Sequence, residues 1–130
     1  MREVQEFLKE ARVYFLATTE NDQPRVRPFG TAEIFEDHLY IETGKNKEVF
    51  KQIEKNNKVE ISAFKDGKWI RITGILKLDD RVEAKKDMLD KNPNLRNMYD
   101  EYDDNTAVLY FEKAQAIISS FTESPKIINF

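Results

Sequence analysis

The chain has 130 residues, of which 40% are hydrophobic, a formal net charge of -3 and no cysteine. This length suffices for one hydrophobic core, so we expect a single domain spanning residues 1–130. The mixed signs of charge argue against a nucleic-acid partner, and the lack of cysteine excludes disulfides and thiolate metal sites.

The N-terminal segment carries charges throughout, and no later stretch is apolar over the roughly 18 residues that a membrane span requires. We therefore expect neither a signal peptide nor a membrane anchor. Together with the missing cysteines, this pattern is typical of a soluble, cytoplasmic protein.

The first third of the chain predicts one helix and three strands. Apolar side chains recur at helical spacing near the N-terminus: Val4, Phe7, Leu8 and Ala11. Residues 12–19 are β-branched and aromatic on both faces, so we expect a strand buried on both sides. In the extended segment 24–35, Pro28 and Gly30 predict a bulge or open edge that a ligand could approach. A third strand is expected at 38–43.

The middle of the chain predicts a helix and a β-hairpin. The helix covers residues 46–56, with Asn46 as its N-cap. Strands 58–64 and 69–78 are joined by the turn signal K-D-G-K. Alternation along the second strand puts Trp69 and Arg71 on one face, opposite an apolar face formed by Ile70, Ile72, Gly74, Leu76 and Leu78.

The last third predicts a helix capped by Asp80 and ended by Pro93, a short second helix around residues 95–102, and strands at 106–111 and 114–122. The tail I-I-N-F is too apolar for a free end. It is expected to be buried either against a second copy in a homodimer or on the chain's own sheet. With about seven short strands in sequential hairpins, the pattern favours a mainly β fold, an antiparallel barrel with helical insertions.

Cationic and polar side chains gather where the third strand turns into a helix. The strand-to-helix junction and the second strand contribute Arg25, Arg27, Thr43, Lys45, Asn46 and Lys47. Free N–H groups at a helix start, together with Lys and Arg, attract an anion such as the phosphate of a small ligand. The same residues also fit an ordinary solvated surface, and their spacing alone leaves both interpretations open.

Residues for acid–base or nucleophilic catalysis are scarce. The only histidine, His38, is interpreted as a strand-edge residue, and the acidic run at 100–105 as a solvated turn, so we predict neither catalytic residues nor a metal site. Trp69 fits either core packing or stacking on a planar ligand, and Arg71 fits either an ion pair or a ligand contact.

A series of segments in chain order resembles one family: Q-P-R-V-R-P-F, L-Y-I-E-T, K-N-K-E-V-F-K-Q-I, N-N-K-V-E-I, W-I-R-I-T-G and S-S-F-T-E-S-P-K-I-I-N-F. They are similar to the pyridoxamine 5'-phosphate oxidase-like split-barrel flavoproteins, in the branch that contains the nitroimidazole-resistance (Nim) proteins. The resemblance implies a six-stranded antiparallel split barrel, a homodimer, and FMN held between the two subunits.

The resemblance also assigns roles to particular positions. It implies that Arg27, Thr43, Asn46 and Lys47 hold the FMN phosphate. Pro28 and Phe29 would lie along the isoalloxazine, and Trp69 and Arg71 would approach a cofactor of the same subunit or of the partner. Asn46-Lys47-Glu48 replaces the Ser-Arg-Lys run of the full oxidases, and no Nim-type histidine stands among residues 31–33, so oxidation of pyridoxamine phosphate is not expected.

The function that this resemblance implies is an FMN-dependent oxidoreductase that takes electrons from NAD(P)H and reduces a small organic acceptor, such as a nitroaromatic compound. One alternative is a non-enzymatic protein that binds or stores flavin or haem. A second alternative is a ligand-free barrel that binds other proteins.

Overall fold

The computed structural model describes residues 1–130. Three α-helices, one 3₁₀ helix and eight strands follow one another as α1 (Arg2–Ala11), β1 (Tyr14–Glu20), β2 (Gln23–Phe29), β3 (Glu33–Phe35), β4 (His38–Gly44), α2 (Glu48–Lys55), β5 (Lys58–Lys65), β6 (Lys68–Asp79), α3 (Val82–Lys91), η1 (Pro93–Asn97), β7 (Thr106–Ser120) and β8 (Lys126–Asn129). None of the helices combines the length and the apolar character needed to cross a bilayer.

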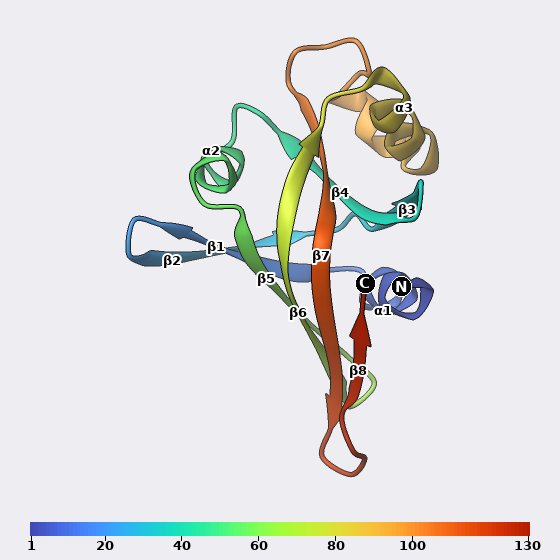
Figure 1. Cartoon of the computed structure of the whole chain (residues 1–130). Coiled ribbons are helices and arrows are strands. Elements are labelled where there is room, and N and C mark those ends of the chain that lie inside the picture. The colour runs from blue at the N-terminus through green and yellow to red at the C-terminus, as the bar shows by residue number, and fades with distance from the viewer.

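All eight strands belong to one antiparallel sheet with the order β2-β1-β5-β6-β7-β4-β3, and β8 adds to β7. In Figure 1 the long strands β5, β6 and β7 run together, β1 and β2 cross them steeply, and the helices lie around the curled sheet. The predicted mainly β fold is therefore confirmed. The strands outnumber the six that the resemblance implied because β3 and β8 are short additional segments.

The core fills the inside of this curled sheet. Twenty-two buried apolar residues form one cluster, contributed by α1, α2 and the strands. Residues 12–19 were expected to be buried on both faces, and that expectation is wrong: Tyr14 and Leu16 are fully buried, whereas Phe15 is 48% exposed. Nothing within one chain covers the outer face of β1.

The last third contains one long strand where two were predicted. β7 runs without a break through Glu112 and Lys113, and the register against β6 shifts between Ile75 and Leu76. The two residues between the predicted strands are instead part of a β-bulge, which bends the strand and keeps it paired. Residues 93–97 form the 3₁₀ helix η1, shorter than the predicted helix at 95–102.

The N-terminal caps of two helices also differ from the prediction. α2 begins after Lys47, because the backbone N–H of Asn46 donates to Asn105 Oδ1 (2.9 Å) and holds residue 46 outside the helix. α3 begins after Arg81, and Asp80 pairs instead with Lys45 at 2.9 Å and with Lys85.

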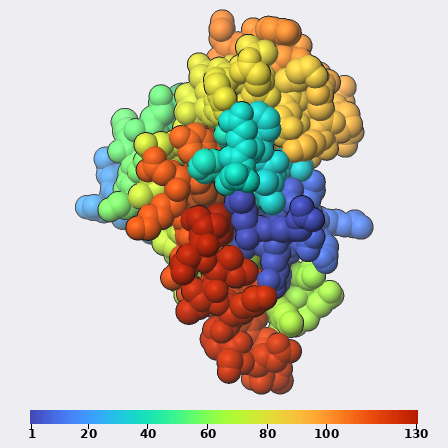
Figure 2. Space-filling model, turned by 45° about the vertical axis from the view of Figure 1, so that its right-hand side comes forward, coloured from blue at the N-terminus to red at the C-terminus, as the bar shows by residue number.

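The apolar tail docks on its own chain. Phe130 exchanges two backbone hydrogen bonds with Ala114, and its ring packs against Phe111. The end of the tail therefore lies on the chain's own sheet, one of its two expected burial sites, whereas Ile127 remains 58% exposed. Figure 2 shows the N-terminal helix in blue beside the red C-terminal strand, and the ion pair between Glu3 and Lys126 joins them.

Candidate functional site

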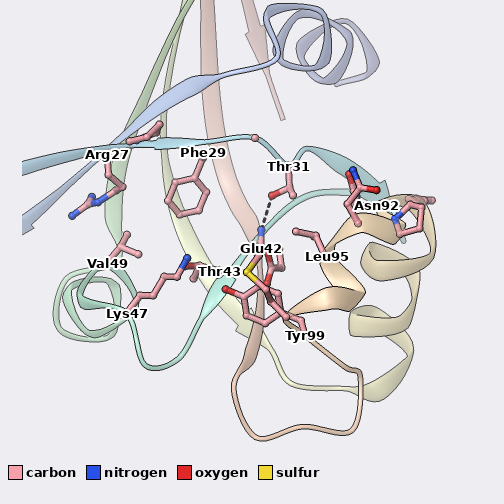
Figure 3. Close-up of a pocket in the computed structure, with 16 residues that line it drawn as sticks. Arg27, Phe29, Thr31, Glu42, Thr43, Lys47, Val49, Asn92, Leu95 and Tyr99 are labelled. Atoms are coloured by element: carbon pink, nitrogen blue, oxygen red, sulfur yellow. Dashed lines mark hydrogen bonds between the residues drawn. The ribbon is translucent and has the colours of Figure 1, made fainter.

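The largest cavity lies where β2 ends, β4 meets α2, and η1 closes one side (Figure 3). Its volume is about 620 Å³. This size and its mixture of apolar and charged walls are typical of small-molecule sites. The lining residues are Arg27, Pro28, Phe29, Gly30, Thr31, Glu42, Thr43, Lys47, Val49, Lys91, Asn92, Pro93, Asn94, Leu95, Met98 and Tyr99.

Arg27 is held rigidly at one end of the cavity. Alternation along β2 turns its side chain toward α2, where the guanidinium donates to Thr18 Oγ1 (2.7 Å) and Gln52 Oε1 (2.6 Å). No carboxylate pairs with it, whereas Arg25 pairs with Glu20. Partial burial lowers the pKa of Arg27, with a smaller contribution from Arg25, yet an arginine stays charged at neutral pH. Arg27 is thus a fixed cation without a counter-ion.

A second cation approaches from the start of α2. Lys47 is exposed, occupies the N-cap position and forms no ion pair, and Figure 3 shows its side chain extending toward Thr43. The backbone N–H groups of the first helical turn lie beside it. Lys47 and Arg27 therefore bring two positive charges and a helix N-terminus to one cavity, an arrangement that suits a phosphate group.

A buried carboxyl group stands between these cations and η1. Glu42 is only 7% exposed, and burial raises its pKa to about 8, against an opposing effect of Lys47 and with a further rise from Asp103. Its backbone N–H donates to Thr31 Oγ1 (2.9 Å), the dashed line in Figure 3. Glu42 is therefore mainly neutral at pH 7.

The remaining walls are apolar and aromatic. Phe29 packs against the buried Tyr14 ring at 6.0 Å between centroids, and Tyr14 donates to Thr31 O (2.6 Å), which fixes the link between β2 and β3. Leu95 and Tyr99 face Phe29 across the cavity (Figure 3). A planar ring system can be enclosed between such walls.

Five of the predicted cofactor-binding residues line this cavity: Arg27, Pro28, Phe29, Thr43 and Lys47. Strand alternation and the junction between β4 and α2 bring them together, as the sequence pattern suggested. They come from β2, from the end of β4 and from the N-cap of α2.

The other five predicted residues lie outside the cavity lining. Arg25 pairs with Glu20 at 3.0 Å and Lys45 with Asp80. Asn46 is exposed, with its backbone N–H engaged by Asn105. On the outer face of the sheet, Trp69 packs against Phe121, and Arg71 pairs with Glu60 at 3.0 Å.

Eleven of the sixteen lining residues were not predicted to bind the cofactor; apart from Gly30, Thr31 and Val49, they form two groups. One is the wall formed by the end of α3, by η1 and by the residues just after it, including Leu95 and Tyr99, whose spacing was interpreted only as helical. The other is Glu42, for which a signal existed: a carboxylate within the apolar strand L-Y-I-E-T. His38 lies away from the cavity, half-buried against Tyr110 at the start of β4.

Comparisons with known proteins reveal relatives of this fold. The family model described as pyridoxamine 5'-phosphate oxidase matches residues 1–116. A crystal structure of a NimC/NimA family protein from Clostridium acetobutylicum is 46% identical, with a TM-score of 0.97, covering 100% of this chain and 92% of that chain. No functionally curated protein matches the sequence.

Two more distant structures share the fold. General Stress Protein 26 from Bacillus anthracis has a TM-score of 0.75 at 16% identity, over 99% of this chain and 97% of that one. A pyridoxamine 5'-phosphate oxidase-related, FMN binding protein from Nostoc punctiforme has a TM-score of 0.64 at 16% identity, over 97% and 90% of the two chains.

Proposed function

The chain belongs to the pyridoxamine 5'-phosphate oxidase family, in its NimC/NimA branch, and on this premise we propose that it binds FMN in the cavity between β2, β4, α2 and η1. The observation that carries the proposal is the pair of cations Arg27 and Lys47. Both line one cavity, and neither has a carboxylate partner within the chain.

The residues of the cavity fit the parts of FMN. Arg27, Lys47 and the N-terminus of α2 would hold the phosphate, with the buried Thr43 beside them. Phe29, Leu95 and Tyr99 would enclose the isoalloxazine and exclude water. The name of the Nostoc punctiforme protein, which shares the fold, includes FMN binding and supports the same choice of cofactor.

We further propose that the loaded protein oxidises NAD(P)H and reduces a small organic acceptor, such as a nitroaromatic compound. FMN would supply the hydride and electron transfer, and this chain's residues would bind it, orient it and keep water from it. Membership in the NimC/NimA branch supports this class of reaction.

A non-enzymatic carrier of flavin or haem is the alternative. The observation that favours a carrier is the scarcity of acid–base groups in the cavity, in which Glu42 is the sole carboxyl group among the lining residues. No histidine is present there, and this lining suits flavin better than haem. NAD(P)H oxidation by the FMN-loaded protein, measured with a panel of nitroaromatic and quinone acceptors, separates the two. Turnover supports the oxidoreductase, and its absence throughout the panel supports the carrier.

We also propose that residues 1–130 act as one FMN-binding domain and form a homodimer. The outer face of the sheet exposes large apolar side chains on β1, β2 and β5: Phe15 at 48%, Val26 at 63% and Phe64 at 65%. Such a face is typical of a covered interface. Trp69 and Arg71 lie on the same outer face. In a dimer that buries this face, these two side chains would lie at the interface and would approach the cofactor of one of the two subunits.

A binding titration tests the cofactor assignment. Quenching of FMN fluorescence gives the Kd for the wild-type chain and for a double variant, Arg27→Ala with Lys47→Ala. We expect the double variant to bind at least a hundredfold more weakly, because two charged hydrogen-bond donors are lost. Lys51→Ala, an exposed lysine of the same helix, is the matched control. Equal affinity of the double variant and the wild type would contradict the assignment.

A further inference from the structure

Glu42 has an oxygen atom without a partner. Oε1 of Glu42 is fully buried and makes no hydrogen bond, and it is the only side-chain oxygen or nitrogen of the chain in this situation. The residue lines the cavity between Thr31 and Thr43. Burying a polar atom in this way is unfavourable, and such atoms in folded proteins nearly always have a partner.

A second buried glutamate, Glu33, has a structural role, and its carboxylate has hydrogen-bond partners within the chain. Glu33 is 3% exposed and accepts hydrogen bonds from Lys9 (2.7 Å) and Asn92 (3.0 Å), which join α1, β3 and the end of α3. Glu42 has no such network. Its carboxyl group lacks a partner within the chain, and the residue lines the cavity, so a ligand in the cavity is the natural source of one.

The charged groups around Glu42 come from several elements. Lys47 at the start of α2 favours the ionised form, Asp103 in the segment before β7 opposes it, and burial opposes it most strongly. Tyr14 on β1 interacts with the same carboxyl group, and burial raises the pKa of this phenol well above its ordinary value. Arg27, on β2, lines the far part of the cavity. The balance keeps Glu42 protonated at neutral pH.

A protonated carboxyl group has an O–H donor next to a carbonyl acceptor. The pyrimidine ring of the isoalloxazine has the complementary pair, a carbonyl acceptor next to an N–H donor. We propose that Glu42, as a neutral acid, hydrogen-bonds to this imide edge of FMN and selects ligands that carry it. This inference rests on the proposed function, because it presumes that FMN occupies the cavity.

The proposal predicts a dependence of FMN affinity on pH. Ionised Glu42 can only accept hydrogen bonds, and its charge would repel the phosphate dianion. With a pKa of about 8, we expect the affinity of the wild-type chain to fall by about fivefold between pH 8 and pH 9. The phosphate itself titrates near pH 6, below this window.

Variants of Glu42 test the proposal by fluorescence titration from pH 7 to pH 9. Glu42→Gln keeps an adjacent donor and acceptor, so it should bind FMN at pH 7 about as well as the wild type, without the decline at high pH. Glu42→Leu has neither group and should bind about tenfold more weakly at pH 7. Glu33→Gln, the control at a buried carboxyl outside the cavity, should keep the wild-type pH profile.

A change in the ligand tests the contact from the other side. FMN methylated at N3 lacks the imide N–H, so the wild-type chain should bind it about tenfold more weakly than FMN. Glu42→Leu should bind both flavins equally. The two flavins are compared on the wild-type chain, so this part of the test does not depend on whether a variant folds.

Thermal unfolding of the FMN-free proteins separates a binding role from a structural one. Removing an unpartnered buried oxygen should raise the unfolding midpoint of Glu42→Leu, whereas Glu33→Gln should lose stability. No FMN binding by the wild type would overturn the proposed function. FMN binding that is equal in the wild type, Glu42→Gln and Glu42→Leu, with one common pH profile, would overturn the role of Glu42 alone.

Discussion

At the scale of single residues, the candidate site is distinguished by cations without counter-ions. Arg25 and Arg27 are two positions apart on β2, and both were predicted to bind the cofactor. Arg25 pairs with Glu20, whereas Arg27 donates to Thr18 and Gln52 and keeps its charge available. A sequence cannot separate such neighbours, because both lie on the same face of β2 and the partner of each depends on which groups of β1 and α2 lie nearby.

This difference gives a prediction that contrasts two similar substitutions. Arg27→Ala should weaken FMN binding by roughly tenfold to a hundredfold, since one charged donor contributes about 1.5–3 kcal/mol. Arg25→Ala should leave the Kd within about twofold, because an exposed ion pair contributes little. Isothermal titration calorimetry with FMN measures both. A larger loss for Arg25→Ala than for Arg27→Ala would place the phosphate outside this cavity.

Glu42 also predicts how the stability of the FMN-free protein depends on pH. The pKa of its carboxyl is raised from 4.5 to about 8 in the folded chain, so between these values the folded state binds a proton that the unfolded state has lost. Stability at this site therefore falls as pH rises through the window, by up to about 1.4 kcal/mol per pH unit.

Urea denaturation at pH 5, 6.5 and 8 measures this dependence. Glu42→Gln cannot titrate, so its free energy of unfolding should decline less between pH 5 and pH 8 than that of the wild type. Parallel curves for the two proteins would show that Glu42 is already ionised in the folded chain at pH 5.

At the scale of elements, the periodic segments were predictable and their interruptions were not. The hairpin of β5 and β6 follows from alternation and from the K-D-G-K turn, where Asp66 and Gly67 adopt positive φ. The Glu112–Lys113 pair fell between the two strands predicted at 106–111 and 114–122. Whether it forms a turn or a bulge depends on β6, which is distant in sequence.

Gly74 shows why the bulge tolerates no side chain on β6. A Cβ atom at this position would lie 2.7 Å from Phe111 Cδ1 and 2.9 Å from Lys113 O. Gly74→Ala should therefore destabilise the chain by about 1–3 kcal/mol through overpacking, measured by urea denaturation. Gly30→Ala is the control, since the nearest atom there is Arg12 O at 3.6 Å. Equal stability of the two variants would contradict the tight packing at the bulge.

One wall of the cavity comes from the insertion between β6 and β7, whose position the sequence pattern did not predict. Leu95, Met98 and Tyr99 close one side, from the insertion between β6 and β7. The sequence predicted apolar helical residues there, and the structure confirms a short helical turn, as the 3₁₀ helix η1. Their direction, toward β2 and β4, follows from tertiary packing, which no local pattern specifies.

At the scale of the whole molecule, fold class could be predicted because alternation, turn signals and family resemblance agreed. The proposed homodimer depends on a surface that the burial pattern of one chain leaves uncovered. The prediction that β1 is buried on both faces was wrong for a single chain, since Phe15 is exposed beside Val26. A second copy on this face would bury it, as the apolar sequence of β1 suggested.

Charged substitutions on the outer face test the dimer. Phe15→Asp combined with Phe64→Asp should convert a dimer into a monomer, because two charges would have to be buried in an apolar interface. Sedimentation velocity gives the mass of each species. Lys51→Ala, on exposed surface at α2, should remain dimeric. A monomeric wild-type chain, or a dimer unaffected by both substitutions, would contradict this interface.

The central claim is that the cavity at the junction of β4 and α2 holds the phosphate of FMN. A crystal structure of the chain grown with FMN tests it most directly. We expect phosphate oxygens within hydrogen-bond distance of Arg27 and of Lys47, with the ring system against Phe29. An ordered FMN elsewhere on the chain, with this cavity filled only by water, would contradict the account.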